Sequence, residues 1–254
     1  FGRVSQRGLM VTYFHGDHIG PMTRSVEDSA IVLQTIAGYD PLDPSTVPVP
    51  VPDYSANLGE DITGLTIGIP KNHFFEILDS EVRGAVDDAI QVLQNRGAKL
   101  REVSLESMQY VPAMQGLLLA DRFVLHEPNF YEQRSLYSPE LSNRLLAGQF
   151  VLARDYIKGI KVQRLLQEEF LSVLQEVDVL AWPTTVCPAF PIGATSILID
   201  GVDYPIAGSA MTITNRNNFV GNMTGLPSIS LPCGFNRDQL PLALQLMGRP
   251  FEEA

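Results

Sequence analysis

The spacing of apolar residues along the chain predicts an alternation of helices and short strands. Apolar positions that recur every three or four residues indicate helices with one buried face. Short apolar or alternating runs bounded by glycine or proline indicate strands. We therefore expect helices over residues 26–37, 81–96, 109–125, 139–147 and 149–176. We expect strands over residues 65–70, 99–105, 178–183, 228–232 and 242–247.

The first two helices carry recognisable start and stop signals. Ser25, with an acid three residues later, resembles a capping box, and Gly38 follows the last apolar position of that helix. Ser80 is the expected cap of the second helix, which Gly97 closes. Between them, residues 40–52 contain five prolines and predict an extended surface connection.

The order of these elements predicts the fold class. The strand at 65–70, the helix after it and the strand at 99–105 form a βαβ unit, whose strands should be parallel. The last two strands are joined by a polar turn through residues 236–238. We expect an α/β fold with a mixed β-sheet covered by helices, without internal repeats.

Composition and charge exclude several classes of protein. The 254 residues are 45% hydrophobic, which is enough to build a sizeable core. The net charge of −11 argues against direct binding of nucleic acid, because phosphate binding needs clustered Lys and Arg. No apolar run approaches the roughly 18 residues of a membrane-spanning helix, so we expect no membrane partner.

The cysteines and histidines do not predict a metal or cofactor. Cys187 and Cys233 lie far apart in apolar, proline-flanked contexts, and buried free thiols are the simpler interpretation. This usage suits the reducing cytoplasm, which is the predicted location. His15 and His18 have a spacing that could hold a metal on a helix, but glycines around them favour a polar loop. We place His73 in a surface loop after the first strand.

Catalytic motifs read directly from the residues are missing. The chain has no nucleophile elbow, Walker loop, dinucleotide fingerprint or zinc-protease motif. Ser209 follows a glycine, but no spacing ties it to a base.

Several short strings resemble, in order and spacing, the amidase signature family downstream of its glycine- and serine-rich signature. They are residues 1–5 (FGRVS), 17–28 (DHIGPMTRSVED), 178–185 (DVLAWPTT), 222–227 (NMTGLP), 231–234 (LPCG) and 244–251 (LQLMGRPF). The resemblance covers essentially the whole chain. It implies an amidase-signature-like α/β fold, incomplete at both ends, in which residues 1–254 form the C-terminal part of a single domain.

The resemblance also implies where the chemistry lies. Family members hydrolyse amides with a Lys, a bridging Ser and a nucleophilic Ser, and need no metal. These residues lie upstream of the position that matches Phe1, so we expect no catalytic residue in this chain. Its four lysines, Lys71, Lys99, Lys158 and Lys161, are better explained as solvated charges.

Two residues are candidates for substrate binding through the resemblance. Arg144 resembles a helix arginine that reaches the substrate pocket and could pair with a carboxylate or carbonyl; an ordinary surface arginine is the alternative. Asn215 matches a position that is Asp in the amide-donor subunits of the glutamyl-tRNA amidotransferase, where the acid reads the α-amino group of glutamine. Asp17 should have a structural role at the Gly20 turn, and Asn222 should bond its own backbone.

Three functions follow from these observations. The first is an amide hydrolase acting on small or aryl and acyl amides, because Asn215 lacks the charge that reads glutamine. The second is the amide-donor (A-type) component of a glutamyl-tRNA amidotransferase, with glutaminase activity. The third is a non-catalytic binding or scaffold protein that lacks the triad. The expected ligand is a small-molecule amide, and the assembly is either a homo-oligomer or a complex with a partner subunit.

Overall fold

The computed structural model describes residues 1–13, 16–206 and 212–254 of the chain. The α-helices are α1 (Val26–Ile36), α2 (Ser80–Asn95), α3 (Gln115–Phe130), α4 (Pro139–Gly148), α5 (Ala153–Val173) and α6 (Val220–Thr224). The 3-10 helices are η1 (Glu106–Met114), η2 (Arg134–Leu136) and η3 (Ile213–Asn215). The strands are β1 (Thr66–Pro70), β2 (Lys99–Val103), β3 (Val179–Pro183), β4 (Ser196–Ile199), β5 (Val202–Pro205), β6 (Ser228–Phe235) and β7 (Pro241–Met247).

Within the described residues, five strands form a mixed sheet in the order β2-β1-β3-β7-β6. β1 pairs in parallel with both β2 and β3, and β7 pairs antiparallel with both β3 and β6. The parallel pair at one side confirms the predicted βαβ unit, and β6 and β7 form an antiparallel hairpin at the other. The expected α/β class with a mixed sheet is therefore confirmed.

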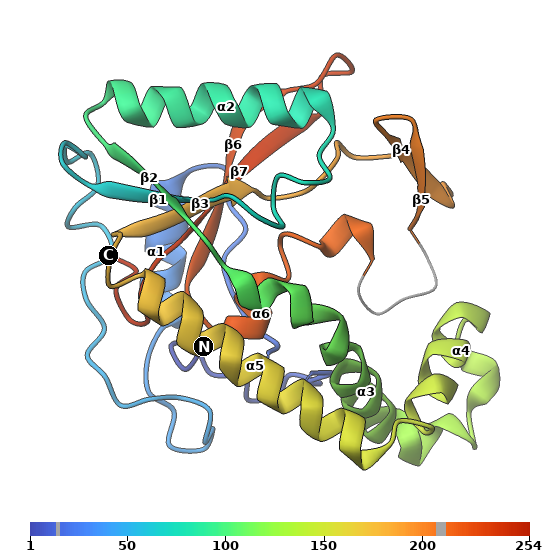
Figure 1. The fold of residues 1–254 in the computed structure, drawn as a ribbon. Coiled ribbons are helices and arrows are strands. Elements are labelled where there is room, and N and C mark those ends of the chain that lie inside the picture. The colour runs from blue at the N-terminus through green and yellow to red at the C-terminus, as the bar shows by residue number, and fades with distance from the viewer. Residues whose placement is uncertain (14–15, 207–211) are drawn as a thin grey trace.

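Helices cover the two faces of this sheet, and consecutive residues of β3 show why (Figure 1). Side chains alternate between the faces of a strand. Ala181 packs in a cluster with residues of α2, whereas Leu180 and Trp182 pack in a second cluster with residues of α3, α5 and η1. All three side chains are fully buried. The near-continuous apolar sequence of β3 reflects burial on both faces.

Most predicted elements are confirmed, with differences at their ends. Ser25 caps α1 as expected, its side chain accepting a hydrogen bond from Asp28 N. The cap of α2 is Asp79 rather than Ser80: its carboxylate accepts from Glu81 N at 2.8 Å. Ser80 is already the first helical residue, since two good capping side chains stand side by side and the sequence does not rank them.

One predicted helix is divided in the structure. Residues 109–125 were expected to form one helix, but the 3-10 helix η1 occupies 106–114 and α3 starts at Gln115. Glu169 of α5 caps η1, accepting hydrogen bonds from the backbone N–H groups of Glu106 and Ser107, both at 2.9 Å. Because this cap comes from another helix, η1 starts earlier than the spacing of apolar residues predicts. Pro112 lies inside η1 and cannot donate a backbone hydrogen bond.

The β4–β5 hairpin was not predicted from the sequence. Its two-residue turn is Asp200-Gly201, and both residues have positive φ, 50° and 79°. Positive φ at both central residues is the geometry that makes Asp-Gly favourable in tight hairpins. The signal was present in the sequence, at a position where we expected no strand.

The packing of α4, the helix that carries Arg144, against α3 can be tested by substitution. A Cβ at Gly148 would clash with the carbonyl oxygen of Leu119 and lie 2.6 Å from Phe123 Cβ. We expect Gly148→Ala to destabilise the fold by about 1–3 kcal/mol in urea unfolding, because the backbone must shift. The matched change is Gly84→Ala in α2, where no atom lies within 4 Å. It should stabilise by about 0.5–1 kcal/mol, and equal effects of both changes would contradict this packing.

Candidate functional site

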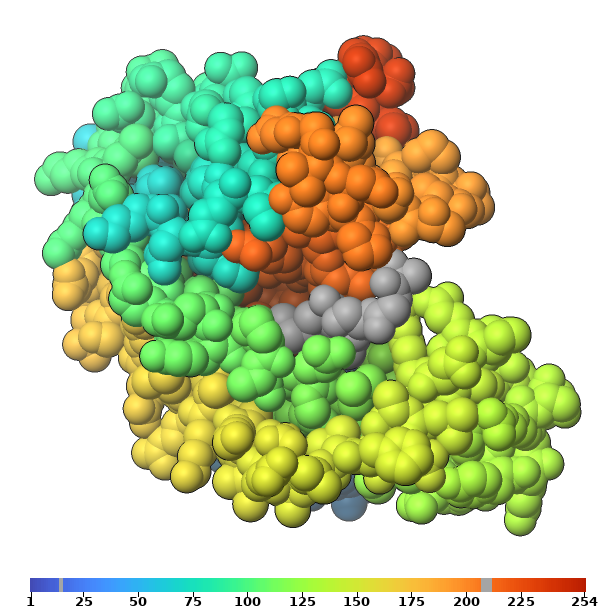
Figure 2. Space-filling view, turned by 45° about the vertical axis from the view of Figure 1, so that its right-hand side comes forward, coloured from blue at the N-terminus to red at the C-terminus, as the bar shows by residue number. Residues whose placement is uncertain are grey.

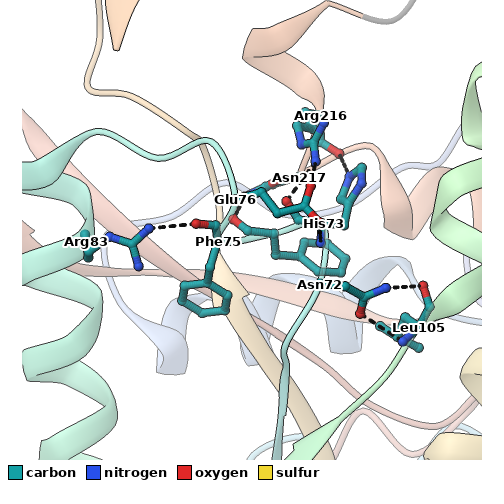
Figure 3. A network of polar contacts seen from close by, with 9 residues as sticks. Asn72, His73, Phe75, Glu76, Arg83, Leu105, Arg216 and Asn217 are labelled. Atoms are coloured by element: carbon teal, nitrogen blue, oxygen red, sulfur yellow. Dashed lines mark hydrogen bonds and ion pairs between the residues drawn. The ribbon is translucent and has the colours of Figure 1, made fainter. Parts of the chain in front are cut away.

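The parallel strands β1, β2 and β3 all end at the same edge of the sheet. In α/β sheets, ligands bind in the crevice outside the carboxyl ends of such strands. The segments that leave this edge are residues 71–76 after β1, 104–105 after β2 and 184–187 after β3. Arg216 and Asn217, far away in the sequence, lie at the same edge (Figure 3).

Asn72 joins the exits of β1 and β2. Its side-chain amide donates to the carbonyl oxygen of Leu105 at 2.8 Å and accepts from Leu105 N at 3.0 Å (Figure 3). The backbone of Lys71 also donates to Val103 O at 3.0 Å. The loop after β1 thus continues the pairing of the two strands beyond their ends.

Asn217 joins the exits of β1 and β3. Its side chain is fully buried, and its amide nitrogen donates to Phe74 O at 3.1 Å and to Pro183 O at 2.9 Å. The rings of Phe74 and Trp182 stack with centroids 4.4 Å apart. Stacked aromatic rings therefore pack at this edge of the sheet, and the buried amide of Asn217 joins the exits of β1 and β3.

Arg216 ties the same segment to the loop after β1. Its guanidinium Nη2 donates to His73 O at 2.9 Å and pairs with Glu76 Oε2 at 2.8 Å (Figure 3). The other carboxylate oxygen of Glu76 accepts from His73 N at 2.8 Å. His73 Nε2 lies 3.4 Å from Arg216 O; since a carbonyl can only accept, Nε2 is the protonated nitrogen in this contact.

The electrostatics of this network keep His73 neutral. Burial lowers the pKa of His73 to about 4, and the neighbouring Arg216 contributes to this lowering. The pKa of Glu76 is lowered by the hydrogen bond from His73 N, with Arg216 adding to the effect. His73 was expected in an exposed surface loop; its ring is instead half-buried and packs edge-on against Phe74, with centroids 5.1 Å apart.

Asn215 ends the short helix η3, directly before Arg216. Its side-chain oxygen accepts from Thr212 N at 2.9 Å, completing a reciprocal capping box with Thr212. The structure thus places Asn215 beside the strand exits, at the edge where α/β sheets usually bind their ligands. Contact with a substrate stays a prediction.

Arg144 lies elsewhere, on α4, which packs against α3. Its Nη2 pairs with Glu140 Oε1 at 2.7 Å within the same helix. Its Nε is buried and has no hydrogen-bond partner among the described residues. Burial, and then the nearby Arg144, lower the pKa of Arg122 on α3. Arg144 is therefore held partly inside the protein next to another cation, and its contact with a substrate also stays a prediction.

The surface is hollowed between the β4–β5 hairpin (orange) and α3 and α4 (green to yellow-green), as Figure 2 shows. Arg144 belongs to α4. The two predicted binding residues thus belong to different structural units, one to the helical pair and one to the edge of the sheet.

Two structural roles were assigned wrongly. Asp17 does not hold the Gly20 turn: its Oδ2 accepts from the backbone N–H groups of Thr12 and Tyr13, at 2.6 and 3.0 Å. Three donors, including Thr12 Oγ1, converge on this one oxygen. Asp17 is structural, as expected, but it closes the turn before it in the sequence rather than the one after.

Asn222 does not bond its own backbone. Its side-chain amide donates to Gly16 O at 2.5 Å and lies 3.3 Å from His18 Nδ1. The partners are more than 200 residues away in the sequence, so local turn propensity could not predict them. Burial lowers the pKa of His18 to about 4.

The remaining candidate residues are placed as follows. All four lysines are exposed, as predicted. Cys187 is buried and Cys233 half-buried, both as free thiols. His15 and Ser209 lie outside the described residues. Within residues 1–13, 16–206 and 212–254, no cluster of three or more His, Cys, Asp or Glu side chains could hold a metal ion. In the same part of the chain, none of the helices has the length and apolarity needed to span a membrane.

Comparison with known proteins assigns the family. A family model described as Amidase matches residues 1–254, the whole chain. The chain belongs to the amidase signature family.

The relatives of this amidase-family chain are of two kinds. An amidase from Pseudomonas putida is 38% identical over 253 residues, covering 99% of this chain and 53% of that protein. The A-type component of the glutamyl-tRNA(Gln) amidotransferase from Geobacter sp. (strain M21) is 36% identical over 278 residues, covering 100% of this chain and 56% of the relative. The chain spans about half the length of these relatives.

A solved structure of this fold is also similar over the whole chain. It is described as an unexpected vestigial protein complex that reveals the evolutionary origins of an s-triazine catabolic enzyme. The TM-score is 0.90 at 25% identity, and the match covers 100% of this chain and 54% of that one.

The polar network at the strand exits was not predicted from the sequence. His73, Glu76, Arg216 and Asn217 come from two segments about 140 residues apart, and neither segment has a motif that pairs it with the other.

Proposed function

We propose that the intact protein is an amide hydrolase that acts on small or aryl and acyl amides through a serine nucleophile. The family match over all 254 residues supports amide hydrolysis. The observation that carries the substrate class is Asn215. It stands beside the strand exits as a neutral amide held by its capping box, where the amide-donor components of the amidotransferase that the chain resembles have an acid.

In this proposal, residues 1–254 are the C-terminal part of a single amidase domain and form walls of its pocket. Several apolar side chains of α1 support this division: Val26, Ile31, Val32 and Ile36 are all exposed. Several exposed apolar side chains on one helix are expected to be covered by further protein. The Lys-Ser-Ser triad would belong to the other part, and no residue of this chain carries a catalytic role.

Arg144 and Asn215 take the substrate-binding roles. The buried Nε of Arg144 has no partner in the described part of the chain and can donate to a carboxylate or carbonyl of the substrate. Asn215 can offer hydrogen bonds but no charge, so it favours neutral amide substrates over a cationic α-amino group.

A second candidate is the amide-donor component of a glutamyl-tRNA amidotransferase. The observation in its favour is that relatives at 34–37% identity carry that name. It predicts glutaminase activity and a partner subunit. Because this chain is acidic, the partner subunit would bind the tRNA.

The test uses the longest natural chain that contains residues 1–254. It should hydrolyse members of a panel of small, aryl and acyl amides with higher kcat/KM than glutamine, and a serine-directed sulfonyl or phosphonate reagent should abolish this turnover. Residues 1–254 alone should show none. Glutamine as the best substrate would favour the second candidate, and failure on every amide would leave a non-catalytic relative.

Substitution of Asn215 discriminates more sharply between the two candidate functions. We expect Asn215→Asp to raise kcat/KM for glutamine by about tenfold, equivalent to about 1.4 kcal/mol, because the carboxylate can pair with the α-amino group. Asn215→Ala is the control and should give no such gain. An equal response of glutamine turnover to both variants would contradict the assignment of this position to the substrate.

A further inference from the structure

Arg216 connects the segment that carries Asn215 to a loop far away in the sequence. Its guanidinium reaches both the carbonyl oxygen of His73 and the carboxylate of Glu76, at 2.9 and 2.8 Å (Figure 3). These partners precede it by 143 and 140 residues. The contact is therefore tertiary, and it starts at the residue next to Asn215.

Local structure cannot determine where Asn215 stands relative to the sheet. The helix η3 has three residues, and its capping box joins Thr212 only to Asn215 itself. These bonds set the internal shape of η3 and leave its position free. Two side chains after it anchor the segment: Asn217 reaches into the core, and Arg216 reaches the loop of residues 71–76.

The loop that receives Arg216 is itself held by two other parts of the fold. Asn72 bonds Leu105 after β2, and Arg83 of α2 donates to Phe75 O at 2.6 Å (Figure 3). His73 has a φ of 66°, a conformation that few residues other than glycine adopt. The hydrogen bond that its backbone N–H donates to the Glu76 carboxylate maintains that conformation. Arg216 therefore docks on a rigid support.

The ion pair within this contact contributes little to stability. The side chains of Arg216 and Glu76 are 22% and 55% exposed, and partly exposed pairs are screened by water. Its effect should instead be geometric, because one Nη2 bonds two fixed acceptors and so defines the direction of the segment.

We propose that Arg216 is a positioning residue for the substrate-binding segment, and that residues 71–76 are thereby a specificity-determining support of the amide pocket. This inference rests on the proposed function, since it takes Asn215 to face the substrate. A change that removes binding shared by the ground state and the transition state raises KM and leaves kcat unchanged.

The experiment measures steady-state kinetics and backbone amide exchange in the longest natural chain containing residues 1–254. Arg216→Lys keeps the charge but removes the planar guanidinium whose Nη2 reaches both acceptors. We expect it to raise KM for the best amide about tenfold while kcat stays within about threefold. Amides of residues 213–219 should exchange faster, with the sheet unchanged. Glu76→Gln, which keeps an acceptor oxygen, should retain most of the wild-type KM.

Arg164→Lys is the matched control, because Arg164 pairs with Glu168 at the same distance of 2.8 Å on the exposed side of α5. It should change neither KM nor exchange. Glu76→Ala provides a second variant if Arg216→Lys is poorly folded, with the same expected change in KM. Unchanged KM and unchanged exchange in both Arg216→Lys and Glu76→Ala would overturn the inference. Inactivity of the wild type on every amide would count against the proposed function, while the exchange data would still test the role of Arg216.

Discussion

We expect replacement of Trp182 by alanine to lower the free energy of unfolding by about 3–5 kcal/mol, which is among the largest effects of a single core substitution. Trp182 is fully buried in β3. Its ring stacks on Phe74 at 4.4 Å and meets Phe170 edge-on at 6.4 Å. Alanine would leave a cavity between the sheet and α5, and the fully buried surroundings could fill it only in part.

Urea unfolding followed by far-UV circular dichroism measures this effect. Tryptophan fluorescence cannot follow it, because Trp182 is the only tryptophan of the chain and the variant lacks it. Trp182→Phe is the conservative variant and should cost less than about 1.5 kcal/mol, since it retains an aromatic ring. The indole nitrogen has no partner among the described residues, so its removal loses no protein hydrogen bond. Phe150→Ala, at a side chain that is 76% exposed, should stay within about 0.5 kcal/mol. A cost of Trp182→Ala as small as that of Phe150→Ala would contradict the packing.

Replacement of Asn217 by alanine should destabilise the protein by about 2–4 kcal/mol, because it removes both hydrogen bonds of a fully buried amide. The carbonyl groups of Phe74 and Pro183 would lose their donor. These groups belong to the exits of β1 and β3, so the change should also loosen the edge of the sheet where Asn215 stands.

Urea unfolding and backbone amide exchange together measure this result. Faster exchange is expected for residues 72–76 and 184–186, at the two strand exits. Asn218→Ala is the matched control: it is the same substitution at the next residue, whose side chain is exposed, and it should stay within about 0.5 kcal/mol. Equal costs at positions 217 and 218 would show that the buried amide does not hold the two exits together.

The strands and helices of the central sheet could be predicted because their burial is periodic in the sequence. β3 is apolar throughout since it is buried on both faces, and α2 repeats apolar residues such as Val82 and Val86 toward the sheet. The parallel pairing of β1 with β2 follows from the handed crossover through α2. Boundaries were less predictable where a tertiary group supplies the cap, as Glu169 does for η1.

The candidate site was predictable only in part. Arg144 and Asn215 came from resemblance to the family, and the structure adds what surrounds each of them. The supports of Asn215 have no local signature, because Arg216 bonds a loop 143 residues earlier. A similar reason explains the error at Asn222, whose amide closes on Gly16 rather than on its own turn.

Periodic burial and ordered motifs along the chain were enough to predict the α/β class, the order of the principal strands and helices, and the amidase signature family. The folded arrangement was needed to show that residues after β1, β2 and β3 are fastened together by Asn72, Asn217 and Arg216. The physical reason is that a buried hydrogen bond needs a partner in space, and the distance along the chain between such partners is set by the fold.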